Sequence, residues 1–231
     1  MNRQNNNKGE DFMLNFAFIS DFDGTLTEKD FYKIIMDEYL KDECAQMYKD
    51  WRNKKIKDVD YLGYVFKNIR RDEKEIDEDI MKISFDKYAG DFIKKVKAAG
   101  GDFVVISAGT SYYINKIFEK NGIKDVDIYS NEAVYKDKGI HFVLDEKSEF
   151  YSEIYGIDKL KVVKKLKEKY DKIFYAGDTE PDLKAALLAD VVFAKNVLVD
   201  LLKKENKECI EFKSFNELWP NVERYIKEWS K

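Results

Sequence analysis

The sequence predicts an α/β fold, in which a doubly wound parallel sheet carries a small α-helical insert. Three observations predict it. Short continuous apolar runs recur along the chain, helical patterns lie between those runs, and one long segment near the start has helical patterning alone. A short continuous apolar run is typical of a strand that is covered on both faces, as the strands of parallel sheets are.

The apolar runs predict the strands. Those expected to form the parallel sheet are residues 16–19, 103–106, 172–176 and 191–194, with an edge strand at 209–212. Apolar residues at helical spacing predict the helices between them: Phe92, Val96 and Ala99; Tyr113, Ile114, Ile117 and Phe118; Leu160, Val163 and Leu166; and Leu183, Ala186 and Leu187 after Pro181. The alternation is that of a Rossmann-like fold. Residues 128–143 interrupt this alternation of strands and helices. Lys138-Gly139 lies there between two short β-prone runs and predicts a hairpin.

The helical insert occupies residues 29–85, which contain no strand-like run. Its apolar side chains fall on two helical faces: Phe31, Ile34, Ile35 and Tyr39 on one, and Tyr61, Tyr64, Val65 and Ile69 on the other. We therefore expect three parts. Residues 1–13 form a flexible tail, residues 14–28 and 86–231 form the core, and residues 29–85 form a helical cap.

Composition excludes several classes of protein. The net charge of -4 lacks the positive field that holds nucleic acid. Two cysteines, Cys44 and Cys209, have no paired spacing, and the single histidine, His141, excludes sites built from several histidines. No segment approaches the roughly 20 apolar residues that span a bilayer, and the polar start is not a secretory signal. A cytoplasmic protein without nucleic-acid or membrane partners is expected.

Polar motifs follow the predicted strands, where ligands bind to open parallel sheets. The first is the string Asp21-Phe22-Asp23-Gly24-Thr25-Leu26-Thr27. Two carboxylates so close repel unless a cation neutralises them or one takes a proton. Mg²⁺ does the former with carboxylate, carbonyl and water oxygens, and a carboxylate can also attack phosphorus. An isolated Asp-x-Asp pair would be read as a helix cap or a turn, but the whole string directly after a buried strand favours a functional site.

This string resembles the first motif of the haloacid dehalogenase-like superfamily, and the resemblance implies three more motifs in a fixed order. The second is a hydroxyl at a strand end, the third a lysine at the start of a helix, and the fourth an acidic loop after a strand. The matching residues are Ser107 with Ala108, then Lys159 with Lys161 as the alternative, then Asp178 with Asp182. Each motif on its own could be an ordinary turn, strand end or helix cap. All four motifs in this order are far more specific to the superfamily.

An insert between the first and second motifs is similar to the helical cap of the phosphoserine phosphatase branch, subfamily IB. Strings at 128–133, 139–142 and 193–198 also resemble phosphatases of methionine salvage, which act on 2-hydroxy-3-keto-5-methylthiopentenyl 1-phosphate. There are departures. Thr179 stands where the branch usually has glycine, Ser107-Ala108-Gly109 replaces Ser-Gly-Gly, and the cysteine-rich stretch of the salvage enzymes is absent. These departures bear on the substrate and leave the catalytic residues in place.

The resemblance implies a Mg²⁺-dependent hydrolase of a small phosphorylated metabolite. Asp21 would be the nucleophile, and Asp23 would act first as general acid and then as general base. The metal would be held by Asp21, Asp178 and the backbone carbonyl of Asp23. Phosphate oxygens would be bound by Ser107, Ala108, Lys159 and Gly24, and Asp182 would orient Lys159 or a metal-bound water.

Other functions stay open. The same aspartyl phosphate could pass to a sugar, as in a phosphotransferase or mutase, or the chain could be a binding module that has lost turnover. Three arginines in the insert, Arg52, Arg70 and Arg71, are surface residues by default, although one could anchor an anionic group. His141 is expected to be structural, and the protein is expected to be a monomer or homodimer.

Overall fold

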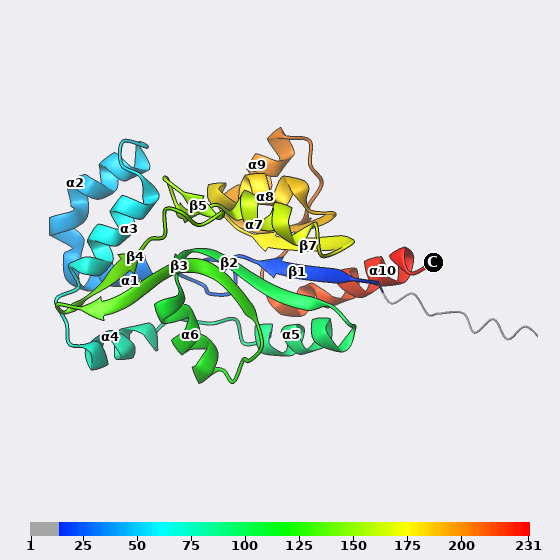
Figure 1. Cartoon of the computed structure of the whole chain (residues 1–231), viewed down its shortest axis with the longest axis horizontal. Helices are drawn as coiled ribbons and strands as arrows, with labels where there is room; N and C mark the ends of the chain where they lie inside the picture. Colours follow the sequence, from blue (N-terminus) through cyan, green and yellow to red (C-terminus); the bar gives the residue numbers. More distant parts are fainter. Residues whose placement is uncertain (1–13) are drawn as a thin grey trace, which may run out of the picture.

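A seven-stranded sheet forms the centre of the protein, whose computed structural model describes residues 14–231 (Figure 1). The strand order is β4-β3-β2-β1-β7-β8-β9. The strands are β1 (Phe16–Ser20), β2 (Asp102–Thr110), β3 (Asp127–Lys136), β4 (Gly139–Val143), β7 (Lys172–Gly177), β8 (Val191–Ala194) and β9 (Ile210–Glu211). Every neighbouring pair is parallel except β3 and β4. The predicted doubly wound α/β fold is confirmed.

Helices cover both faces of this sheet (Figure 1). On one face lie α5 (Ala89–Ala98), α6 (Ser111–Lys120) and α10 (Trp219–Trp229), and on the other lie α7 (Lys159–Leu166), α8 (Leu183–Leu188) and α9 (Asn196–Lys204). Successive side chains of β1 point to opposite faces of the sheet, and both faces are covered by helices. This explains why the sequence of β1 is apolar at successive positions. Phe16 and Phe18 enter the core beneath α5, whereas Ala17 and Ile19 enter the core beneath α7 and α8.

The insert is entirely helical. It contains α1 (Phe31–Ile35), a π-helical turn (Met36–Leu40), α2 (Lys41–Arg52), α3 (Asp58–Lys67) and α4 (Glu73–Ile80). Its two connections to the rest of the chain run side by side. Glu28 N donates to Ser84 O, and Asp86 N donates to Leu26 O, each at 2.9 Å. Aromatic packing fills the interior, where the Trp51 and Tyr61 rings stack 4.3 Å apart.

The hairpin predicted around Lys138-Gly139 is present as β3 and β4. The sequence did not indicate that β3 also extends the parallel sheet, where Val104 of β2 is paired with Asp127. Most β3 side chains are half-buried or exposed, so it lacks a continuous apolar run. The predicted edge strand is β9, and a second small hairpin joins β5 (Tyr151–Ser152) to β6 (Gly156–Ile157).

Strand β1 pairs with β2 on one side and β7 on the other. Because all three run in the same direction, the residues that follow them meet at one edge of the sheet. Helices α1, α2 and α3 lie at this end of the sheet (Figure 1). Within residues 14–231, no helix has the length and apolar character needed to cross a membrane.

Candidate active site

Three buried side chains meet at this edge. Asp21 directly follows β1 and is 4% exposed, while Ser107 on β2 is 1% exposed and Asp178 after β7 is 5% exposed. The amide of Asp21 donates to the carbonyl of Ala176 at 2.9 Å, which fixes the start of the loop against β7. The structure therefore brings together the predicted residues of three distant motifs.

Lys159 extends into the same site from the first turn of α7. The side chain of Asp158 begins that helix by accepting hydrogen bonds from the amides of Leu160 and Lys161. Lys159 Nζ lies 2.6 Å from Asp21 Oδ1 and 2.7 Å from Asp182 Oδ1. Burial lowers the pKa of Lys159, but Asp182 and Asp21 raise it more, so the ammonium stays charged. The alternative, Lys161, is exposed and donates to Tyr151 O.

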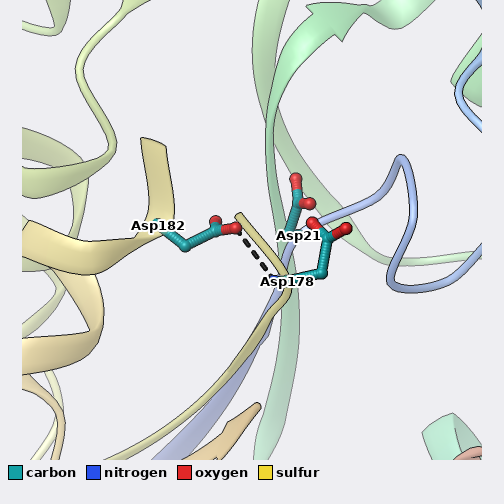
Figure 2. A group of neighbouring side chains, drawn as sticks. All are labelled: Asp21, Asp178 and Asp182. Atoms are coloured by element: carbon teal, nitrogen blue, oxygen red, sulfur yellow. Dashed lines mark hydrogen bonds between the residues drawn. The ribbon is translucent and has the colours of Figure 1, made fainter. Parts of the chain in front are cut away.

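Asp182 is a fully engaged carboxylate. Its Oδ1 accepts from Lys159 Nζ and, at 2.7 Å, from the hydroxyl of Tyr175. Its Oδ2 accepts from the amide of Asp178 at 3.1 Å (Figure 2) and from that of Thr179, also at 3.1 Å. With both oxygens occupied, Asp182 holds Lys159 and the acidic loop in place.

Asp178 keeps one oxygen free. Its Oδ2 accepts from Asn196 Nδ2 at 3.3 Å, whereas its Oδ1 is buried without a hydrogen-bond partner. Carboxylate oxygens of Asp21, Asp178 and Asp182 lie within 4.8 Å of one another (Figure 2). Burial and the charge of Asp182 raise the pKa of Asp178 to about 6, and they raise that of Asp21 well above its usual value. A buried carboxylate oxygen without a hydrogen-bond partner, such as Asp178 Oδ1, next to a second carboxylate is a suitable ligand for a hard divalent cation such as Mg²⁺.

The carboxyl group of Asp23 lies apart from this acidic group. Its Oδ1 accepts from the amide of Phe31 at 3.3 Å, and its Oδ2 accepts from Ser107 Oγ at 3.3 Å and Tyr113 Oη at 2.5 Å. Burial and the charge of Asp30 raise the pKa of Asp23 to about 7. A pKa in this range suits a group that gives and takes a proton near neutral pH.

A cavity of about 270 Å³ connects these groups to the insert. Its floor contains residues of the first three motifs: Asp21, Asp23, Ser107, Ala108, Gly109 and Lys159. Thr179, Glu180 and Pro181, from the loop of the fourth motif, also line the cavity. Its wall from the insert combines aromatic and apolar side chains with charged ones: Tyr32, Trp51, Leu62 and Phe66, and Asp30, Lys33, Arg52, Lys54 and Asp58. The cavity thus has a charged floor and a wall that offers both aromatic and charged side chains.

A family model for haloacid dehalogenase-like hydrolases matches residues 18–187. The chain belongs to this family. The hydrolase is 27% identical over 214 residues to the 2-hydroxy-3-keto-5-methylthiopentenyl-1-phosphate phosphatase of Bacillus pumilus, with 90% of this chain and 92% of that relative covered. It is 26% identical to the enzyme of the same name from Lysinibacillus sphaericus, with 85% and 89% covered.

Solved structures share its fold. A substrate-bound phosphoserine phosphatase superposes with a TM-score of 0.66 at 22% identity, covering 89% of the hydrolase and 97% of that chain. A cytosolic 5'-nucleotidase IIIB bound to cytidine superposes with a TM-score of 0.61 at 18% identity, covering 92% and 85%. The parallel sheet is therefore that of a well-represented hydrolase fold.

Several side chains of the site were not singled out by their sequence pattern. Tyr113 was expected only as part of an apolar helix face, and Asn196 only as part of a family string, yet they contact Asp23 and Asp178. Of the three arginines in the insert, Arg70 pairs with Glu43 and Arg71 with Asp79, whereas Arg52 lines the cavity. The sequence did offer one signal for Tyr113: a tyrosine on an apolar helix face that is expected to be buried carries a hydroxyl group that needs a hydrogen-bond partner.

Gly24 is required by the close approach of the acidic loop. Its φ is +79°, and a Cβ there would overlap Asp178 Oδ2. We expect Gly24→Ala to lower the free energy of unfolding by about 1–3 kcal/mol and the activity by at least about tenfold, because Asp178 must move. Thermal unfolding and kcat/KM would measure both. Gly90→Ala in α5, where a Cβ meets no atom within 4 Å, is the control; equal losses in both variants would contradict this explanation.

Proposed function

We propose that this hydrolase is a Mg²⁺-dependent phosphatase of a small phosphorylated metabolite, with Asp21 as its nucleophile. The observation that carries the proposal is the arrangement around Asp21. Lys159 holds one carboxylate oxygen, Asp178 presents a bare oxygen nearby, and the carboxyl group of Asp23 lies on the same cavity floor. This arrangement places a nucleophile, a cation site and a proton donor around one phosphoryl group of a substrate.

The residues would act in two steps. In the first, a carboxylate oxygen of Asp21 bonds to phosphorus, the bond from phosphorus to the leaving oxygen breaks, and that oxygen takes a proton from Asp23. In the second, Asp23 removes a proton from a water that attacks the phosphorus and frees Asp21. Ser107, Lys159 and the amides beside Gly24 and Ala108 would bind the phosphoryl oxygens as charge develops on them.

The metal site would be formed by Asp21, Asp178 and the backbone carbonyl of Asp23. Asp182 would not be among its ligands, because each of its two oxygens already accepts two hydrogen bonds, whereas each oxygen of Asp21 accepts one. Mg²⁺ at this site would reduce the repulsion between the phosphate and the Asp21 carboxylate. The protein would contribute the dry, preorganised surroundings.

Residues 29–85 would act as the cap that selects the substrate, over a core of residues 14–28 and 86–231. The aromatic and apolar part of the wall suits an uncharged tail on the phosphate, and aromatic rings such as Trp51 make favourable contacts with thioether sulfur. The names of the relatives describe such a substrate, 2-hydroxy-3-keto-5-methylthiopentenyl 1-phosphate. We favour it over phosphoserine because these relatives are named for it and because Trp51 can contact its thioether. The charged lining residues, such as Lys33, Arg52 and Asp58, would instead suit the carboxylate and amino groups of phosphoserine, so the two substrates must be compared directly.

Phosphate release tests the reaction class. The purified protein should hydrolyse an aryl phosphate when Mg²⁺ is present, and it should lose activity in excess chelator and regain it with added Mg²⁺. Asp178→Asn should raise the Mg²⁺ concentration for half-maximal activity by about 10- to 100-fold or more, while Asp171→Asn, which changes an exposed aspartate, should not. An activity that persists without divalent cations would rule out the metal site, and transfer to sugars in place of phosphate release would favour a phosphotransferase.

The substrate is tested by direct competition. The thioether-containing phosphate and phosphoserine would be compared by kcat/KM, with the expectation that the former is preferred by at least about tenfold. Trp51→Ala should reduce this preference, because one aromatic contact with the tail is lost. A preference for phosphoserine would contradict the substrate assignment and leave the reaction class standing.

A further inference from the structure

Tyr113 places a hydroxyl group in an otherwise apolar environment. It is the third residue of α6, its side chain is 1% exposed, and its ring centroid lies 5.2 Å from that of Phe31 and 6.0 Å from that of Phe22. Phenylalanine would fill this space equally well. The hydroxyl therefore needs a polar partner, and that partner is Asp23 Oδ2 at 2.5 Å.

The backbone around this pair makes room for it. A Cβ at Gly109 would overlap the hydroxyl of Tyr113 and lie 2.8 Å from Asp23 Oδ2. The absence of a side chain at this position of β2 thus permits the contact between α6 and the loop after β1. The glycine is thus a second feature, beside the hydrogen bond itself, on which the contact between Tyr113 and Asp23 depends.

The carboxyl group of Asp23 is held from two sides. Its Oδ1 accepts from the amide of Phe31, the first residue of α1 in the insert, and its Oδ2 accepts from Tyr113 and Ser107 on the core. The bonds from Phe31 and Ser107 are 3.3 Å long, so the one from Tyr113 is the shortest of the three. Removing the hydroxyl would leave the carboxyl group held only by the two longer bonds, from Phe31 and Ser107, and so less firmly oriented.

We propose that Tyr113 is a positioning residue, which holds the Asp23 carboxyl group in the orientation that delivers a proton to the leaving oxygen. This inference rests on the proposed function of Asp23 as general acid. The chemistry gives it a specific signature. A poor leaving group needs the proton as its bond to phosphorus breaks, whereas a good leaving group departs as a stable anion without one.

The test compares kcat/KM for phenyl phosphate and 2,4-dinitrophenyl phosphate in four proteins with Mg²⁺: wild type, Tyr113→Phe, Tyr112→Phe and Asp23→Asn. Tyr113→Phe should reduce kcat/KM for phenyl phosphate by about 10- to 100-fold and that for the dinitrophenyl ester by less than about threefold. Tyr112→Phe is the matched control, because the Tyr112 hydroxyl lies elsewhere and donates to Glu73 of α4. It should leave both values unchanged.

Asp23→Asn separates the two proposals. It should show the same dependence on the leaving group, with a larger loss for phenyl phosphate of about 10²–10⁴-fold. If Asp23→Asn shows the dependence and Tyr113→Phe does not, the inference about Tyr113 is wrong and the proposed function stands. If Asp23→Asn affects both esters equally, Asp23 is not the general acid and the inference fails with it. Equal thermal unfolding of Tyr113→Phe and Tyr112→Phe would support a loss that is specific to the site.

Discussion

Asp21→Asn should reduce kcat by at least about 10⁴-fold, the loss expected when a covalent nucleophile is removed. The amide has nearly the volume of the carboxylate but cannot attack phosphorus. The fold should survive, because burial and the charge of Asp182 raise the pKa of Asp21 well above its usual value, so the buried charge is itself costly. Single-turnover phosphate release and thermal unfolding would measure the two effects.

The control for this variant is Asp91→Asn. Asp91 lies on the exposed side of α5 with only a surface partner, Lys94, so its activity should stay within about twofold of wild type. Asp21→Asn with a substantial fraction of wild-type turnover would exclude Asp21 as the nucleophile. Loss of the folded state in that variant would be a different failure, and the unfolding measurement detects it.

Lys159→Ala should damage both catalysis and stability. The ammonium lies 2.6 Å from Asp21 Oδ1 and 2.7 Å from Asp182 Oδ1, and all three side chains are buried. Its removal leaves two buried carboxylates without their cation, which is expected to lower the free energy of unfolding by about 3–5 kcal/mol. The loss of a charge opposite the phosphoryl oxygens should also reduce kcat/KM by about 10²–10³-fold.

Lys161→Ala is the matched control, two residues along the same helix. Lys161 is exposed and donates to Tyr151 O, so its removal should change the free energy of unfolding by less than about 0.5 kcal/mol. Lys159→Met, which retains much of the side-chain volume, separates the loss of charge from the creation of a cavity. A larger kinetic loss in Lys161→Ala than in Lys159→Ala would reassign the third motif.

The central strands could be predicted because they are buried on both faces. Residues 16–19 and 173–176 are continuous apolar runs, and both form strands of the parallel sheet. Strand β3 belongs to the same sheet, but its outer half, residues 132–136, pairs with β4. Its alternating burial gives the pattern of a two-stranded hairpin, which hides its parallel pairing with β2.

The acidic residues of the site could be predicted because each follows a strand. Parallel strands bring their carboxyl ends to one edge, so Asp21, Ser107 and Asp178 were expected to meet. The roles of Tyr113 and Asn196 depend on side-chain directions that no local pattern encodes. Asn196 has a φ of +48° and donates to Asp178 from the start of α9, a contact that exists only once β7 and β8 lie side by side.

Chemical trapping of the intermediate tests the mechanism most directly. The enzyme would be quenched during turnover of a saturating substrate, reduced with borohydride and digested, since borohydride converts an aspartyl phosphate to homoserine. Mass spectrometry of the peptide that follows β1 should then find homoserine at position 21 and unmodified aspartate at position 23. Homoserine at another position, or an unmodified Asp21 in an enzyme with a demonstrated phosphoenzyme, would contradict the account.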